Sequence, residues 1–134
     1  MVDEFFKSFL EGSNIKTPEA VLEAFINKFS GTVNTEWFKV EDLYEAVFYH
    51  NGIEKIAKFS GDGTWHETGI NTDKDLIPSA VKSAAEKNGE IMSSIEFRTA
   101  GSSKFEIVVR DSQMNRFLLI INDSGKLIKN KPII

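Results

Sequence analysis

The sequence has no cysteine, two histidines, three prolines and no long uninterrupted apolar run. Without cysteine the chain has neither a disulfide framework nor a thiol nucleophile. A membrane-spanning helix needs about 18 or more consecutive apolar residues, so we expect no membrane span. The 16 basic and 20 acidic side chains give a net charge of −4. Because the basic residues form no cluster along the chain, we expect no nucleic-acid partner.

The chain begins with an acidic segment, whereas a secretory signal peptide begins with a basic one. Met1-Val2 is followed by Asp3 and Glu4, and the apolar residues after them are interrupted by Lys7 and Ser8. No export signal is visible. The sequence as written therefore predicts a cytoplasmic protein, unless a leader preceding Met1 has been removed.

A length of 134 residues with 41% hydrophobic content is enough to bury one sizeable core. We expect residues 1–134 to form a single domain. A short amphipathic helix is predicted over residues 3–11, because its apolar residues follow a helical spacing. These residues are Phe5, Phe6, Phe9 and Leu10.

Two further helices are predicted, and each is followed by strands. Thr17 is expected to cap the first of them, with Pro18 at its first position and Gly31 beyond its end. The second is expected to run from Pro78 to about Asn88. Alternating hydrophobicity and turn residues such as Asn51-Gly52 and Asp62-Gly63 indicate antiparallel strands. The expected strands are residues 33–40, 44–49, 53–59, 64–68, 91–99, 104–110, 116–121 and 126–130.

The order of one helix and four strands occurs twice, as repeat one in residues 17–70 and repeat two in residues 76–132. Pro18 and Pro78 are 60 positions apart, as are Trp37 and Phe97. Gly63 and Gly125 are 62 apart, which fits small insertions at the turns. Neither half has a core thick enough to stand alone. We therefore expect an α+β fold in which two four-stranded antiparallel units join into one sheet, with the helices on one face.

Several strand and turn motifs resemble those of the beta-lactamase-inhibitor-like, PepSY-like family. The matching residues are Trp37, Tyr44-Glu45-Ala46-Val47-Phe48, Phe59 to Trp65, Phe97, Phe105-Glu106-Ile107-Val108-Val109 and Ile121 to Leu127. The likeness covers residues 17–132. The chain departs from the family where an aspartate usually follows the strand-ending phenylalanine, since it has Ser60 and Asn122 there.

The resemblance implies a curved, BLIP-like sheet with helices on its convex side and a concave face free to hold another protein. It also implies no established enzymatic activity. Family members usually carry an export leader, which implies a periplasmic protein if a leader was removed.

No residue pattern in the chain is typical of a catalytic or metal site. Ser79-Ala80-Val81-Lys82 matches the Ser-x-x-Lys motif of penicillin-interacting enzymes, but the companion Ser-Asp-Asn and Lys-Thr-Gly motifs are absent. His50 and His66 lack the spacing of helical metal ligands. Asp62 and Asp123 fit turns better than a calcium loop. We therefore expect no catalytic residue, no metal, no cofactor and no enzyme.

Alternation along the strands assigns the side chains to two faces of the sheet. One face is the core under the helices and includes Phe48 and Ile107. The opposite face carries more large apolar groups than a water-exposed sheet ordinarily has. These groups form the candidate binding face: Phe38, Val47, Tyr49, Ile56, Val108, Leu118 and Ile120.

The sequence thus predicts a non-enzymatic binding module that engages a protein partner, which the sequence does not identify, on the open concave face. The alternative function is a carrier of a small apolar ligand or lipid on the same face. The helix of residues 3–11, or a second copy in a homodimer, is an alternative cover for that face. A third class, an enzyme acting through Ser79 or the histidines, lacks the companion motifs.

Overall fold

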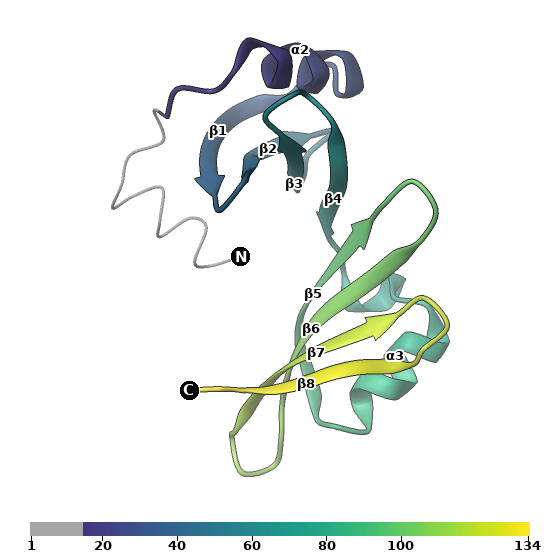
Figure 1. The fold of residues 1–134 in the computed structure, drawn as a ribbon. Coiled ribbons are helices and arrows are strands. Elements are labelled where there is room, and N and C mark those ends of the chain that lie inside the picture. Colours follow the sequence, from purple (N-terminus) through teal and green to yellow (C-terminus); the bar gives the residue numbers. More distant parts are fainter. Residues whose placement is uncertain (1–14) are drawn as a thin grey trace. The chain divides into compact units, whose positions relative to one another are not determined.

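The structure, a computed structural model, describes residues 15–134 (Figure 1). The helix expected over residues 3–11 lies outside the described residues. Within them the chain folds as two α-helices, a short 3-10 helix and eight strands, which follow one another in sequence order along the sheet. Every pairing described for these strands is antiparallel. The predicted α+β class with an antiparallel sheet is confirmed.

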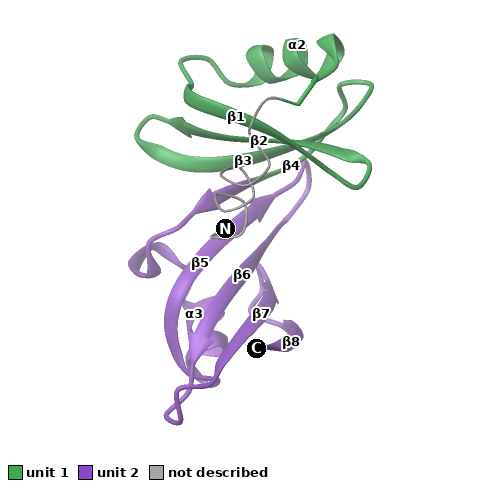
Figure 2. Cartoon of the chain, turned by 90° about the vertical axis from the view of Figure 1, so that its left-hand side faces the viewer, with its two compact units in different colours: residues 1–68 green, residues 69–134 purple. Residues whose placement is uncertain are grey.

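The elements are α2 (Glu19–Lys28), β1 (Val33–Val40), β2 (Leu43–His50), β3 (Ile53–Ser60), β4 (Trp65–Asn71), η1 (Lys74–Leu76), α3 (Ser79–Glu86), β5 (Glu90–Arg98), β6 (Ser103–Arg110), β7 (Arg116–Asn122) and β8 (Leu127–Ile133). The chain divides into two compact units, unit 1 up to Thr68 and unit 2 from Gly69 (Figure 2). Strand β4 crosses this boundary, so its residues belong to both units.

The core of unit 1 lies between α2 and one face of β2 and β3. Val21 and Phe25 are the buried residues of the helix, and Phe25 meets Phe48 edge to face at 4.9 Å between ring centroids. Ala57 and Phe59 of β3 also belong to the buried cluster. Fully burying each large side chain of this kind contributes about 1.5–3 kcal/mol before entropy is subtracted.

The core of unit 2 lies between α3 and one face of β6 and β7. Val81 and Ala85 of the helix are buried against Ile107, Leu119 and Ile121 of the strands. The helix α3 presents small side chains where α2 presents Phe25, and Phe105 of β6 is the buried aromatic residue of this cluster. The face expected to form the core is confirmed in both units.

Both helices begin directly after a proline in an extended conformation. Pro18 (φ −57°, ψ 145°) and Pro78 (φ −53°, ψ 142°) occupy the N-cap position, one residue earlier than expected. Their carbonyls accept hydrogen bonds from Val21 N–H and Lys82 N–H. The prediction that Thr17 caps the first helix was wrong, because the proline takes that position. Thr17 Oγ1 is buried without a hydrogen-bond partner among the described residues.

Two glycine turns press against these helix starts. Gly63 (φ 93°) and Gly125 (φ 91°) adopt the left-handed conformation, which glycine takes without steric cost. A Cβ atom added to Gly63 would lie 2.7 Å from the carbonyl oxygen of Ala20, and one added to Gly125 would lie 2.8 Å from that of Ala80. Each turn therefore fits its own helix only because it lacks a side chain.

The expected correspondence of Trp37 and Phe97 was wrong. Trp37 pairs with Ala46 and packs under α2, whereas Phe97 pairs with Lys104 on the face away from α3. The reason is the turn between β5 and β6, which is longer than the turn between β1 and β2 and shifts the register. Ser94, paired with Ile107, takes the place under α3 that Trp37 holds under α2.

Two strands run further than the sequence pattern indicated. Strand β4 continues past Thr68 to Asn71, and β8 continues past Asn130 to Ile133. Pro132 is tolerated in β8 because this strand ends the strand order, so one side of its backbone needs no partner. The expected connector contains η1, where the Asp73 carboxylate accepts the N–H of Asp75 at 3.1 Å.

Candidate functional site

The second face of the sheet, opposite the helix in each unit, carries all seven predicted binding residues. In unit 1, Phe38, Val47 and Ile56 form a cluster separate from the one under α2. They are only 3%, 6% and 3% exposed. The strand register places these three residues on the same face of β1, β2 and β3, and in this structure they are buried.

Tyr49 is the exposed member of the predicted face in unit 1. Its side chain is 40% exposed near the end of β2, and its hydroxyl donates to Glu54 Oε2 at 3.5 Å across the β2–β3 pair. Burial raises the pKa of Glu54, and the hydrogen bond from Tyr49 acts in the opposite direction. The pair offers a polar contact beside an aromatic ring.

In unit 2 the predicted residues lie together on β6 and β7. Val108 pairs directly with Leu118, and Ile120 is on the same face two residues further along β7. All three are half-buried. Partial exposure in the middle of a strand leaves aliphatic surface within reach of another molecule.

The strand register also gathers basic side chains around this aliphatic centre. They are Lys104, Arg110, Arg116, Lys129 and Lys131. The sequence analysis predicted no basic cluster, because these residues are far apart along the chain. They come together only where β6, β7 and β8 pair. The spacing of Lys129 and Lys131 was a sign that they share one face, but their neighbours depend on the pairing with β7.

Ion pairs involve charged residues of both units. Lys58 and Glu67 approach to 3.2 Å in unit 1, and Arg110 and Glu90 to 3.4 Å in unit 2. Arg98 donates to Glu96 at 3.0 Å, and this hydrogen bond raises the pKa of the guanidinium. None of these ion pairs has the geometry of a general acid–base pair at a catalytic site.

Within neither unit does the structure group the residues considered for catalysis. Ser79 is the exposed first residue of α3, and Lys82 lies one turn later, with no hydrogen bond between the two side chains in the described structure. His50 Nδ1 accepts from Lys55 Nζ at 3.0 Å, and its ring packs on Phe29. His66 is exposed on β4. In residues 15–134 no three side chains of metal-binding type are grouped to hold an ion.

The acidic turn residues serve their own turns. Asp62 Oδ1 accepts from Ser60 Oγ at 2.7 Å and from Thr64 N–H at 2.9 Å, and these hydrogen bonds lower the pKa of Asp62 to about 2. At the turn after β7 the acceptor is Asn122, whose Oδ1 receives the N–H groups of Ser124 and Lys126. Asp123 has no such role. The expected turns are confirmed.

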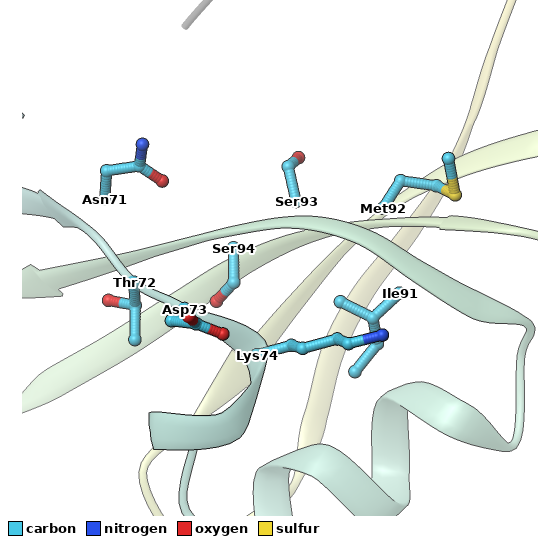
Figure 3. Close-up of a pocket in the computed structure, with 8 residues that line it drawn as sticks. All are labelled: Asn71, Thr72, Asp73, Lys74, Ile91, Met92, Ser93 and Ser94. Atoms are coloured by element: carbon cyan, nitrogen blue, oxygen red, sulfur yellow. The ribbon is translucent and has the colours of Figure 1, made fainter.

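A hollow of about 460 Å³ lies in unit 2 beside β5. Figure 3 shows that its lining side chains point to both sides of the strand, with Asn71 and Ser93 on one side and Lys74 and Ser94 on the other. Ser94 is 2% exposed and its hydroxyl has no hydrogen-bond partner among the described residues. The lining is mostly polar, unlike the apolar pocket that a lipid or drug-sized ligand requires.

Of the helices in residues 15–134, none has the length and apolar character needed to cross a membrane.

Comparison with known proteins gives structural relatives only. No protein-family model and no curated protein sequence matches the chain. A DUF2874 family protein from Bacteroides ovatus superimposes with a TM-score of 0.79 at 19% identity, covering 89% of each chain. A protein from Bacteroides eggerthii, provisionally described as periplasmic, gives a TM-score of 0.80 at 19% identity over 89% of this chain and 91% of that one.

A BLIP-like protein from Bacteroides fragilis gives a TM-score of 0.74 at 18% identity, covering 92% of this chain and 91% of that one. None of these descriptions names an enzymatic activity. At such low identity the likeness establishes the fold alone, and the chain has a BLIP-like fold.

Proposed function

We propose that this chain is a non-enzymatic binding module that engages a protein partner on the second face of its sheet. The observation that carries the proposal is the aliphatic centre of Val108, Leu118 and Ile120, which stays partly exposed on interior strands. Tyr49 adds an exposed aromatic group in unit 1. Aromatic and aliphatic groups of this kind anchor protein interfaces when a polar border surrounds them.

We also propose that the chain is related to PepSY-like proteins and that its two halves arose by tandem duplication. It is supported by the proline at the start of each helix and by the glycine turn that closes on each helix start. Phe38, Val47 and Ile56 belong to the proposed face, although they are buried in this structure. An exported, periplasmic location fits the description of the Bacteroides eggerthii structure.

The test is the double substitution Tyr49→Asp with Leu118→Asp. Because both side chains are at least partly exposed, we expect the free energy of unfolding to fall by no more than about 1 kcal/mol. Capture of the partner from cells, followed by its identification and a binding measurement with purified protein, should fail for this variant.

The matched control is Ile26→Asp with Met114→Asp, at positions 66% and 64% exposed and off the second face. This variant should bind the identified partner as the unchanged chain does. If the Tyr49 and Leu118 changes cost several kcal/mol of unfolding free energy, the face is core and the proposal fails. Equal binding by all variants would also contradict it.

A further inference from the structure

The second face of unit 2 combines an aliphatic centre with a basic border. Residues directly opposite each other on antiparallel strands share a face. Leu118 lies between Val108 on β6 and Lys131 on β8. Ile120 lies between Glu106 on β6 and Lys129 on β8. The aliphatic residues thus occupy the interior strands, and ammonium groups follow them along the last strand.

Two further rows extend this border. Lys104 lies on the same face with its ammonium group 5.8 Å from the centre of the Phe97 ring. At the other end of β6, Arg110 lies directly opposite Arg116. Two acidic residues lie among these strands on the same face: Glu106, opposite Ile120, and Glu90, which is paired with Arg110. The face is therefore strongly cationic in a chain whose net charge is −4.

The Arg110–Arg116 pairing is unfavourable in the isolated chain. Like charges directly opposite each other in a sheet destabilise it. Arg110 is compensated by Glu90 at 3.4 Å, whereas Arg116 forms no ion pair within residues 15–134. Lys129 and Lys131 are likewise exposed and without an ion pair in that part of the chain. These three cationic side chains are therefore available to pair with the carboxylates of an acidic ligand.

Edge protection explains only part of this pattern. Lysine and proline on an edge strand discourage pairing with other chains, which accounts for Lys129, Lys131 and Pro132 on β8. It does not account for Arg116 on β7 or Lys104 on β6, which are interior strands. The basic border therefore extends beyond what edge protection needs.

We propose that this face binds an acidic polypeptide segment of a partner protein, one whose carboxylates flank apolar side chains. The inference rests on the proposed function and names the chemistry of the partner. Apolar groups of the segment would cover Val108, Leu118 and Ile120, and its carboxylates would meet Arg116, with its bidentate geometry, and the lysines of β8. Single-stranded nucleic acid fits less well, because bases stack on aromatic rings and this centre is aliphatic.

The probe is a synthetic amphipathic peptide in which glutamates flank a stripe of leucines, with a matched peptide carrying glutamine in place of every glutamate. The full chain should bind the glutamate peptide about tenfold more tightly than the glutamine peptide, and the difference should shrink as salt is added. Replacing the leucines with serine should weaken binding as well. Equal affinity for the glutamate and glutamine peptides would overturn the inference.

The variant that tests the face is Lys129→Glu with Lys131→Glu, two exposed positions on the last strand. It should weaken binding of the glutamate peptide about tenfold and leave the glutamine peptide unaffected. Lys74→Glu with Lys87→Glu is the matched control, because it changes the net charge by the same amount at exposed positions outside the face. If both variants lose affinity equally, the effect comes from net charge and the inference fails. Circular dichroism checks that each variant is folded.

Further outcomes separate this inference from the proposed function and from other occupants. If binding of the natural partner is lost with Leu118→Asp but kept with the Lys129 and Lys131 changes, the proposed binding module stands and the acidic partner does not.

Three results would identify another occupant of the face. If Asp3→Asn, Glu4→Gln and Glu11→Gln in the full chain increase peptide affinity tenfold, the occupant is the chain's own first segment. Self-association abolished by the Lys129 and Lys131 changes would identify a second copy. Tighter binding of a single-stranded oligonucleotide than of the glutamate peptide would identify nucleic acid, and each of these three results would overturn the inference.

Discussion

The absence of a side chain at two glycines decides how two turns fit against two helices. At Gly63 an added methyl group would meet both a left-handed backbone angle and the carbonyl of Ala20 at 2.7 Å. We expect Gly63→Ala to lower the free energy of unfolding by about 2 kcal/mol or more, because the turn and the helix start would have to separate. Chemical denaturation measures the loss.

Gly101 is the matched control for this substitution. It lies in the exposed turn between β5 and β6, with nothing within 4 Å of an added Cβ atom. Gly101→Ala should leave the free energy of unfolding nearly unchanged. Similar losses at both glycines would show that the contact with Ala20 contributes nothing.

The Asp62 turn predicts a specific dependence of stability on pH. Hydrogen bonds from Ser60 and Thr64 lower the pKa of Asp62 from 3.8 to about 2. The ionised carboxylate therefore stabilises the folded state above pH 3.8, and this stabilisation is lost as the pH falls toward about 2. Asp62→Asn should be less stable than the unchanged chain at pH 7, and the two stability curves should converge between about pH 4 and pH 2. Parallel curves over that range would contradict the assignment.

At the scale of a strand, neighbouring residues of β2 have opposite environments. Phe48 is 1% exposed and contacts the rings of Phe25 and Phe29, whereas Tyr49 is 40% exposed on the other face. Phe48→Ala should cost about 3–5 kcal/mol of unfolding free energy, and Tyr49→Ala less than about 1 kcal/mol. Denaturation of the two variants side by side gives the comparison. Equal costs would mean that the two faces have been exchanged.

Most elements could be predicted from the sequence, because apolar and polar residues alternate along each strand and each turn contains residues typical of turns. Asn51-Gly52 is an example, since both residues have the positive φ that their types favour. The end of β4 and the last residues of β8 could not be predicted, because pairing with neighbouring strands extends them. Pro132 even argues against a strand until the position of β8 at the end of the strand order is known.

The second face shows the same limit more clearly. Its residues could be assigned from alternation, but the burial of Phe38 depends on packing that alternation does not record. The basic border around Leu118 is assembled from three strands, so only the register shows it. The predicted correspondence of Trp37 and Phe97 was wrong for a related reason. The longer turn between β5 and β6 changes which residues of these two strands pair with each other.

At the scale of the whole molecule, the two tryptophans provide a probe of one unit. Trp37 and Trp65 both lie in unit 1, so tryptophan fluorescence reports its unfolding, whereas far-ultraviolet circular dichroism reports both units. Because β4 crosses the boundary between the units, we expect them to unfold together. Ile107→Ala, in the core of unit 2, should cost about 2–5 kcal/mol and lower the fluorescence midpoint along with the circular dichroism midpoint.

The outcome of that experiment also tests whether the chain is a single domain. Phe48→Ala, in the core of unit 1, is the matched change on the fluorescent side. If Ile107→Ala produces an early transition in circular dichroism while the fluorescence midpoint stays in place, the units unfold independently. The single-domain prediction would then be wrong.

The open turn at Gly101 has a practical consequence. Thr99 Oγ1 closes the turn through local hydrogen bonds with Ser102, and a Cβ atom added to Gly101 would meet nothing within 4 Å. A foreign peptide grafted between Ala100 and Gly101 would extend into solvent and leave both cores undisturbed. An affinity tag or a fluorescent label placed there would allow the protein to be immobilised or followed in cells without altering the surface proposed for its partner.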